Sequence, residues 1–211
     1  SMKENSICKK NTSQLLSIKY LDYETALKRT FTRIEENAVI SSWKDSWHTT
    51  KSKEISKYIN VPSYGCVKNT QKILIQNKEE AINKLWGIGG NNGWFYMNWA
   101  WQIRGIIDKL CGGIGLRRGR TNPKNINPGD ALDFWRVIYS NKNDGRLLLY
   151  AEMKMPGSAW LEWSIISEQD WLYLKQEATF RPKGILGRLY WYLLFIPHLF
   201  IFSGLAKRIA Q

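Results

Sequence analysis

The sequence predicts an α+β protein in which a run of antiparallel strands is followed by one long apolar helix. The first observation is a set of four segments between residues 129 and 183 that are rich in β-branched and aromatic residues. The turn-forming stretches NKNDG, MPGS and SEQD separate these segments, as expected for consecutive antiparallel strands. The second observation is the stretch from Leu189 to Ala206, which contains no charged residue. The third is that the chain before residue 129 reads mainly as helices and loops.

The composition separates an N-terminal segment from the main domain. Residues 1–19 are polar, and Asp22 fits the N-cap of a helix from Tyr23 to about Asn37. A Ser/Lys-rich stretch follows, and Pro62 interrupts any continuing helix. We therefore expect residues 1–60 to form a tail, a helix and a linker, and residues 61–211 to form the main domain.

Further elements follow from local patterns in the main domain. Residues 66–76 alternate well enough for a first strand, and Asn77 fits the N-cap of a short helix through Trp86. A glycine-rich turn precedes a second helix at residues 94–110, and a short strand is predicted at 116–120. The four later strands are predicted at residues 131–140, 146–155, 159–167 and 171–181, and the last helix at 184–209.

Tryptophan is unusually frequent, with 11 copies in the chain. Each indole buries a large apolar area, so this density indicates either a thick core or an aromatic-lined cavity. Both readings stay open from the sequence, and a filled core is the simpler one. If a cavity exists, its candidate walls are Trp94, Trp99, Phe134, Trp135, Leu149, Met153, Trp163 and Trp191.

The net charge of +13 is concentrated in the middle of the chain, at and near the RRGR stretch. Arg117, Arg118 and Arg120 are candidate contacts for a phosphate or carboxylate, although a plain basic surface loop is the simpler explanation. We expect no nucleic-acid partner, because no continuous basic helix or nucleic-acid motif accompanies the charge.

The predicted strands also carry carboxylates. With a three-residue turn at Pro156, Glu152 would sit opposite Glu162, and two close carboxylates would raise one pKa as acid–base chemistry requires. A two-residue turn would instead place them on opposite faces. We favour a solvated sheet face for these carboxylates. The apolar face toward the last helix would then be formed by Phe134, Leu147, Leu149, Met153, Leu161, Trp163, Leu172 and Leu174.

No motif for a cofactor, metal or catalytic dyad has its proper context. The glycine-rich stretches at 87–93 and 111–118 lack the spacing of a dinucleotide-binding fingerprint. Tyr150 and Lys154 have the spacing of a Tyr-x-x-x-Lys dyad, but in a strand they would lie about 13 Å apart. His48 and His198 are isolated, so we expect no metal site.

The last helix allows two interpretations. Its length and lack of charge suit a membrane span, but Pro197 and His198 lie in its middle. We favour a helix packed on the sheet, with peripheral membrane contact as the alternative. The three widely spaced cysteines and the absence of an apolar leader favour the cytoplasm.

The sequence resembles known proteins both in the order of its elements and in its local motifs. The order of elements is similar to the helix-grip fold of the START and birch-pollen-allergen superfamily, in which a curved antiparallel sheet wraps a long C-terminal helix over a cavity. The chain from about residue 23 also resembles the family known as domain of unknown function 2867. The matching stretches include GGNNGWFY at 89–96, GDALDFWRV at 129–137, AEMKMPGSAWLEW at 151–163 and F.P.G.LGRLYWY at 180–192.

The resemblance implies a helix-grip domain and supplies no catalytic residues. Members of this family often follow an NAD(P)-binding domain of the short-chain dehydrogenase type, so NAD(P) would reach this chain only through a fused or partner domain. We therefore expect a module that binds an apolar or amphipathic small molecule beside a reductase- or epimerase-like domain, without autonomous activity. A structural or dimerisation domain with a filled core is the alternative.

Overall fold

The computed structural model describes residues 21–35, 56–116, 119–120 and 125–211. The chain forms two compact units, Ser1–Ile40 and Ser41–Gln211. In the first unit, helix α2 spans Tyr23–Glu35, and the backbone N–H of Thr25 donates a 3.0 Å hydrogen bond to the Asp22 carboxylate. The predicted N-cap is therefore confirmed, while the predicted end of the helix at Asn37 lies outside the described residues.

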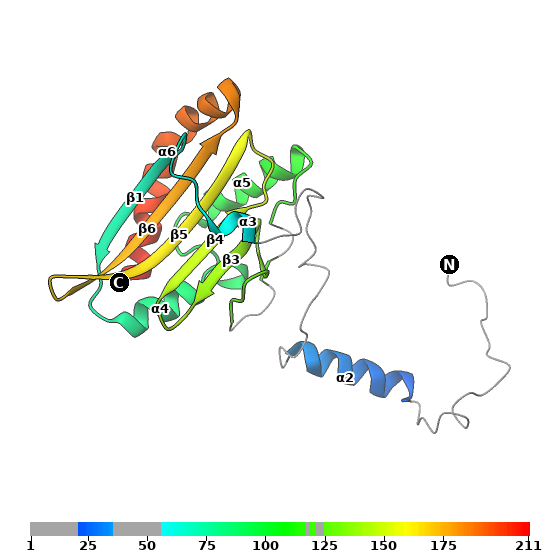
Figure 1. Ribbon diagram of the computed structural model, residues 1–211. Helices are drawn as coiled ribbons and strands as arrows, with labels where there is room; N and C mark the ends of the chain where they lie inside the picture. Colours follow the sequence, from blue (N-terminus) through cyan, green and yellow to red (C-terminus); the bar gives the residue numbers. More distant parts are fainter. Residues whose placement is uncertain (1–20, 36–55, 117–118, 121–124) are drawn as a thin grey trace. The chain divides into compact units, whose positions relative to one another are not determined.

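The second unit contains a six-stranded antiparallel sheet in the order β1-β6-β5-β4-β3-β2 (Figure 1). Strands β3 to β6 follow one another as hairpins, and β1 pairs with β6. The strands are β1 (Val67–Leu74), β2 (Ala131–Leu132), β3 (Trp135–Asn141), β4 (Arg146–Ala151), β5 (Gly157–Glu168) and β6 (Trp171–Pro182). This arrangement confirms the predicted run of antiparallel strands.

The longer helices of the second unit cover one face of the sheet, and Figure 1 shows α6 behind it along most of its length. The helices of the second unit are α3 (Ser56–Ile59), α4 (Lys78–Trp86), α5 (Asn98–Leu110) and α6 (Gly184–Ala210), with a 3₁₀ turn at Gly90–Asn92. The carboxamide of Asn77 caps α4 by accepting from the N–H groups of Glu79 and Glu80, as predicted.

The core lies between the sheet and the helices. Strand alternation turns Leu149, Leu161 and Leu174 toward α6, where they join Leu205 and Ile209 in one buried cluster. The prediction of an apolar face against the last helix is therefore confirmed. An α+β fold with a long C-terminal helix on an antiparallel sheet is the helix-grip arrangement expected from the sequence.

The predicted strand at residues 131–140 is instead a tight hairpin formed by β2 and β3. Leu132 pairs with Trp135, and Asp133 between them has a φ of 52°. Asp tolerates this left-handed conformation better than most residues do. The Asp133 carboxylate also accepts a 2.8 Å hydrogen bond from the Trp94 indole N–H, which holds the turn against the core.

The predicted helix at residues 94–110 begins later than expected, at Asn98. Phe95 and Met97 adopt positive φ values of 57° and 49°, which end any regular helix before that point. The Asn98 side-chain oxygen accepts a 2.8 Å hydrogen bond from the Trp94 N–H, so this turn folds back onto the start of α5.

The other face of the sheet is only partly exposed to solvent. Over β3 to β5, Ile138, Leu148 and Trp160 form a second buried cluster. Tyr58 from α3 and the following Val61 pack against this cluster, and the Trp160 indole donates a 3.1 Å hydrogen bond to the Tyr58 carbonyl oxygen. The expectation of a solvated outer face is therefore wrong over these strands.

Candidate functional site

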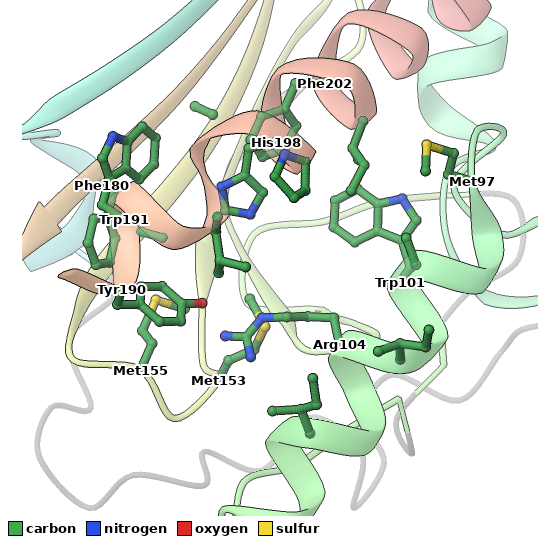
Figure 2. Close-up of a pocket in the computed structure, with 18 of the residues that line it drawn as sticks. Met97, Trp101, Arg104, Met153, Met155, Phe180, Tyr190, Trp191, His198 and Phe202 are labelled. Atoms are coloured by element: carbon green, nitrogen blue, oxygen red, sulfur yellow. The ribbon is translucent and has the colours of Figure 1, made fainter. Parts of the chain in front are cut away.

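A cavity of about 310 Å³ lies between α5, α6 and strands β5 and β6 (Figure 2). Most of its wall is aromatic and apolar. Phe180 and Trp191 stack with ring centroids 5.6 Å apart, and His198 and Phe202 stack at 5.1 Å. Other walls include Trp101 from α5 and Ala159 from β5. The volume is within the range of small-molecule sites, at its lower end.

Helical spacing explains why α6 lines this cavity. Leu194, His198 and Ile201 follow at i, i+4 and i+7, so they lie on one side of α6 together with Trp191. On α5, Trp101 and Arg104 are three positions apart and both reach the cavity. Figure 2 shows Arg104 of α5 and His198 of α6 at the cavity beside the aromatic side chains of the same helices.

Three cavity-lining residues carry buried nitrogen atoms that have no hydrogen-bond partner among the described residues. These atoms are Nη2 of Arg104, Nε1 of Trp135 and Nδ1 of His198. Buried polar groups are normally hydrogen-bonded, because leaving a buried donor unpaired costs about 1–3 kcal/mol. Their gathering around one cavity suits a ligand with a hydrogen-bond acceptor.

Arg104 gives the cavity wall a positively charged group, and the buried Asp108 lies near enough to act electrostatically on the Tyr190 hydroxyl. Arg104 lies over the Tyr190 ring, with its guanidinium carbon 5.6 Å from the ring centroid. Burial, followed by the nearby Arg104 charge, lowers the pKa of His198 to about 4, so its imidazole is neutral at pH 7. Burial also raises the pKa of the Tyr190 hydroxyl. No carboxylate lines the described part of the cavity, so Arg104 supplies its formal charge at neutral pH.

The structure brings half of the sequence-predicted wall residues to this cavity. Trp99, Trp135, Met153 and Trp191 line it, and Trp99 stands at its mouth with 59% of its surface exposed. The remaining four do not reach it and are fully or almost fully buried in the core cluster: Trp94, Phe134, Leu149 and Trp163.

Two of the core tryptophans have structural hydrogen bonds that account for their burial away from the cavity. Trp94 donates to Asp133, as described above. Trp163 donates a 2.8 Å bond to the Gln176 side-chain oxygen, and the Gln176 amide donates in turn to the Phe202 carbonyl oxygen of α6. These hydrogen bonds hold the two indoles in the core. Periodicity in the sequence does not reveal them, because the partners are distant in the chain.

The carboxylate pair that a three-residue turn would have formed is absent. Glu162 pairs with Leu148 across β4 and β5, and residues 152–156 form a longer connection than either turn considered from the sequence. Glu152 is buried and accepts a 2.9 Å hydrogen bond from Nε of Arg136. Glu162 instead accepts from Arg146 at the surface. Neither carboxylate lines the cavity.

Of the three candidate anion contacts, Arg120 is described, and it lies away from the cavity. Arg117 and Arg118 lie outside the described residues. Arg120 is half-buried, and its Nη1 donates a 3.1 Å hydrogen bond to the Ile88 carbonyl oxygen. Burial lowers the pKa of this guanidinium. Arg120 therefore ties the loop at residue 120 to the segment that follows α4.

Sequence reasoning missed the polar groups that do meet in the cavity. Arg104 lies within a helix that reads as largely buried, and His198 looks isolated because its neighbours in space are far away in the sequence. The available signal was the spacing of His198 with Leu194 and Ile201 on one side of an otherwise apolar helix.

The sheet order and helix packing define a helix-grip α+β domain with a cavity beneath its C-terminal helix. A family model described as "Protein of unknown function (DUF2867)" matches residues 68–205. The chain therefore belongs to this family, as its motifs indicated. A comparison with curated proteins gives no match.

Several solved structures show a distant similarity. The crystal structure of Ara h 8.0201 aligns at 10% identity with a TM-score of 0.36, covering 69% of this chain and 98% of that chain. TTHA0849 from Thermus thermophilus aligns at 11% identity with a TM-score of 0.33, covering 69% of this chain and 94% of that chain. CalU16 from Micromonospora echinospora aligns at 12% identity with a TM-score of 0.29, covering 68% of this chain and 83% of that chain. The fold assignment rests on the strand order and helix packing described above.

Proposed function

We propose that this domain binds a small amphipathic molecule in the cavity between α5, α6 and the sheet. The observation that carries the proposal is the set of three buried nitrogen atoms, on Arg104, Trp135 and His198, around an otherwise apolar space. An apolar body would pack against the aromatic walls, and an acceptor group on the ligand would pair with these nitrogens.

The charge in the cavity favours an anionic acceptor, such as a carboxylate. The Arg104 guanidinium presents parallel N–H donors that match a carboxylate in a charge-assisted pair. The neutral His198 and the Trp135 indole would add uncharged donors. A fatty acid or an apolar aromatic acid meets both requirements, because each has an apolar body and a single acidic head.

The wall chemistry supports binding rather than catalysis by a carboxylate, a serine or a thiol. No Asp, Glu, Ser or Cys is among the described residues that line the cavity. In this proposal the domain takes no cofactor of its own. It would hold the ligand beside an NAD(P)-dependent reductase- or epimerase-like domain, an association that only the family resemblance supports.

The direct test is titration of the full chain with cis-parinaric acid, a fluorescent fatty acid, followed by displacement with palmitic acid. We expect saturable binding and energy transfer from the cavity tryptophans. Ala159→Phe fills the cavity and should abolish this signal, while Ser167→Phe, at an exposed site on the same strand, should preserve it. Absence of saturable binding, or unchanged binding to Ala159→Phe, contradicts the proposal.

The acidic head is tested separately with palmitic acid and methyl palmitate. Arg104→Gln should lower the affinity for palmitic acid about 10- to 100-fold, the range expected for a lost charge-assisted hydrogen bond. It should leave the affinity for methyl palmitate nearly unchanged. Arg146→Gln removes an arginine on the outer face and serves as the matched control. Equal losses for acid and ester would contradict an anionic head.

A further inference from the structure

The two helices that border the cavity carry an unusually large exposed apolar surface. On α5 the exposed residues recur at helical spacing, and on the first part of α6 they do the same. We call this surface the apolar face. It consists of Trp99, Ile103, Ile106, Ile107 and Leu110 of α5, and of Ile185, Leu186, Leu189, Tyr192, Leu193, Ile196 and Phe200 of α6.

Helix α6 lies along the domain surface and does not leave it. By length and composition it is the one helix in the described part of the chain that could cross a membrane. Its C-terminal part, however, belongs to the buried core through Phe202, Leu205 and Ile209. The large apolar residues that α6 exposes lie at or before Phe200, with Leu193 showing 78% of its surface. Such a helix suits an orientation parallel to a bilayer surface.

The exposed charges on these two helices are exclusively basic. They are Lys109 on α5 and Arg188, Lys207 and Arg208 on α6. The acidic residue of α5, Asp108, is fully buried and accepts hydrogen bonds from the N–H groups of Gly115 and Lys154. An apolar surface bordered by positive charge is complementary to anionic lipid, whose headgroups attract each nearby Lys or Arg.

The cavity opens on this same surface. Trp99, Ile103 and Ile107 are at least 46% exposed and also line the cavity. Exposed aromatic residues such as Trp99 and Tyr192 are typical of the lipid–water interface, where an apolar ring and a polar edge are both accommodated.

We propose that the apolar face docks on an anionic lipid bilayer as a peripheral surface, with the cavity mouth turned toward the lipid. An amphipathic molecule could then pass between bilayer and cavity without crossing water, a consequence that rests on the proposed function. A second copy of the chain fits this face less well, because an isologous contact would bring its basic borders together.

The test is co-sedimentation of the full chain with vesicles, in the absence of any fatty acid. The protein should co-sediment with vesicles made of equal parts of phosphatidylcholine and phosphatidylglycerol. Added salt should weaken this binding because it screens the basic residues that border the apolar face. Vesicles of phosphatidylcholine alone should bind it more weakly. Leu193→Glu combined with Ile196→Glu should reduce binding about tenfold or more, since two apolar groups leave the interface.

Leu74→Glu provides a matched control. Leu74 is exposed at the end of the edge strand β1 that pairs with Tyr173, away from the β6 end that leads into α6. This single glutamate should leave vesicle binding unchanged, whereas Leu193→Glu alone should already weaken it. Arg188→Glu with Lys109→Glu should lower the affinity for anionic vesicles while leaving binding to phosphatidylcholine alone nearly unaffected.

Two results would overturn the docking proposal. The first is an absence of vesicle binding by the unmodified chain. The second is a stable dimer in light scattering that Leu193→Glu converts to a monomer without changing vesicle binding, which assigns the face to a second copy. Vesicle binding and parinaric acid binding are measured independently, so a chain that binds only the probe contradicts docking alone, and one that binds only vesicles contradicts ligand binding alone.

Discussion

The side-chain amide of Gln176 donates a 2.9 Å hydrogen bond to the main-chain carbonyl oxygen of Phe202. This contact joins the middle of β6 to α6, and the other end of the same side chain accepts from the Trp163 indole. Gln176 is fully buried. One polar side chain thus satisfies a sheet indole and a helix carbonyl inside an otherwise apolar core.

Gln176→Leu should lower the free energy of unfolding by about 2–3 kcal/mol, because it leaves the Trp163 N–H buried without its acceptor. Urea denaturation would measure the change. Gln71→Leu is the control, since Gln71 pairs with Gln176 across the sheet but is only half-buried. A loss for Gln176→Leu no larger than for Gln71→Leu would contradict this role.

Asp133 should make folding stability fall as the pH rises from about 4 to about 6. Burial raises the pKa of this carboxyl from 3.8 to about 6, although the Trp94 hydrogen bond opposes the shift. Between the two values the unfolded chain ionises first, so the folded state loses stability relative to it, by about 3 kcal/mol at most.

Asp133→Asn should remove this fall, because an amide has no charge to bury and still tolerates the left-handed turn. Thermal unfolding measured across this pH range, in the unmodified chain and in the variant, tests it. Parallel pH profiles for the two proteins would show that Asp133 does not titrate as described.

The two Arg–Glu pairs should differ sharply in their contributions. Glu152→Gln leaves the fully buried Arg136 charge without its carboxylate and should cost about 3–5 kcal/mol. Glu162→Gln removes the partner of a half-exposed Arg146 and should cost less than about 1 kcal/mol. Urea unfolding of both variants provides the comparison, and similar losses would contradict the burial argument.

Binding of a carboxylate ligand should raise the pKa of His198. In the free protein burial holds this pKa at about 4, and an anion beside the imidazole favours its protonated form. Titration of the imidazole signals by NMR, with and without palmitic acid, would show the shift. The other histidine of the chain, His48, provides an internal reference. An unchanged His198 pKa on saturation would place the acidic head elsewhere.

The sequence was sufficient for the strand run, the α6 helix and the caps at Asp22 and Asn77, because each depends on local periodicity or local hydrogen bonding. It was insufficient for the turn at Asp133, whose backbone conformation is stabilised by Trp94, a residue 39 positions away in the chain. A tertiary contact of this kind leaves no local pattern.

The cavity was harder to predict than the fold for the same reason. Candidate walls were chosen for aromatic character, but hydrogen bonds to Asp133 and Gln176 hold Trp94 and Trp163 in the core instead. The register of β4 and β5 also depended on the connection at residues 152–156, so the relation of Glu152 to Glu162 could not be read from spacing.

The partial cover on the outer face of the sheet has a consequence for the protein's internal motions. Over β3 to β5 both faces are packed, whereas the outward side chains of β1, such as Lys68 and Lys72, face solvent. Amide hydrogens of Val137, Leu148 and Leu161 should therefore exchange with deuterium slowest, and those of β1 earliest among the strands. Local unfolding would begin at the β1 edge of the sheet and would reach the strands that are covered on both faces last.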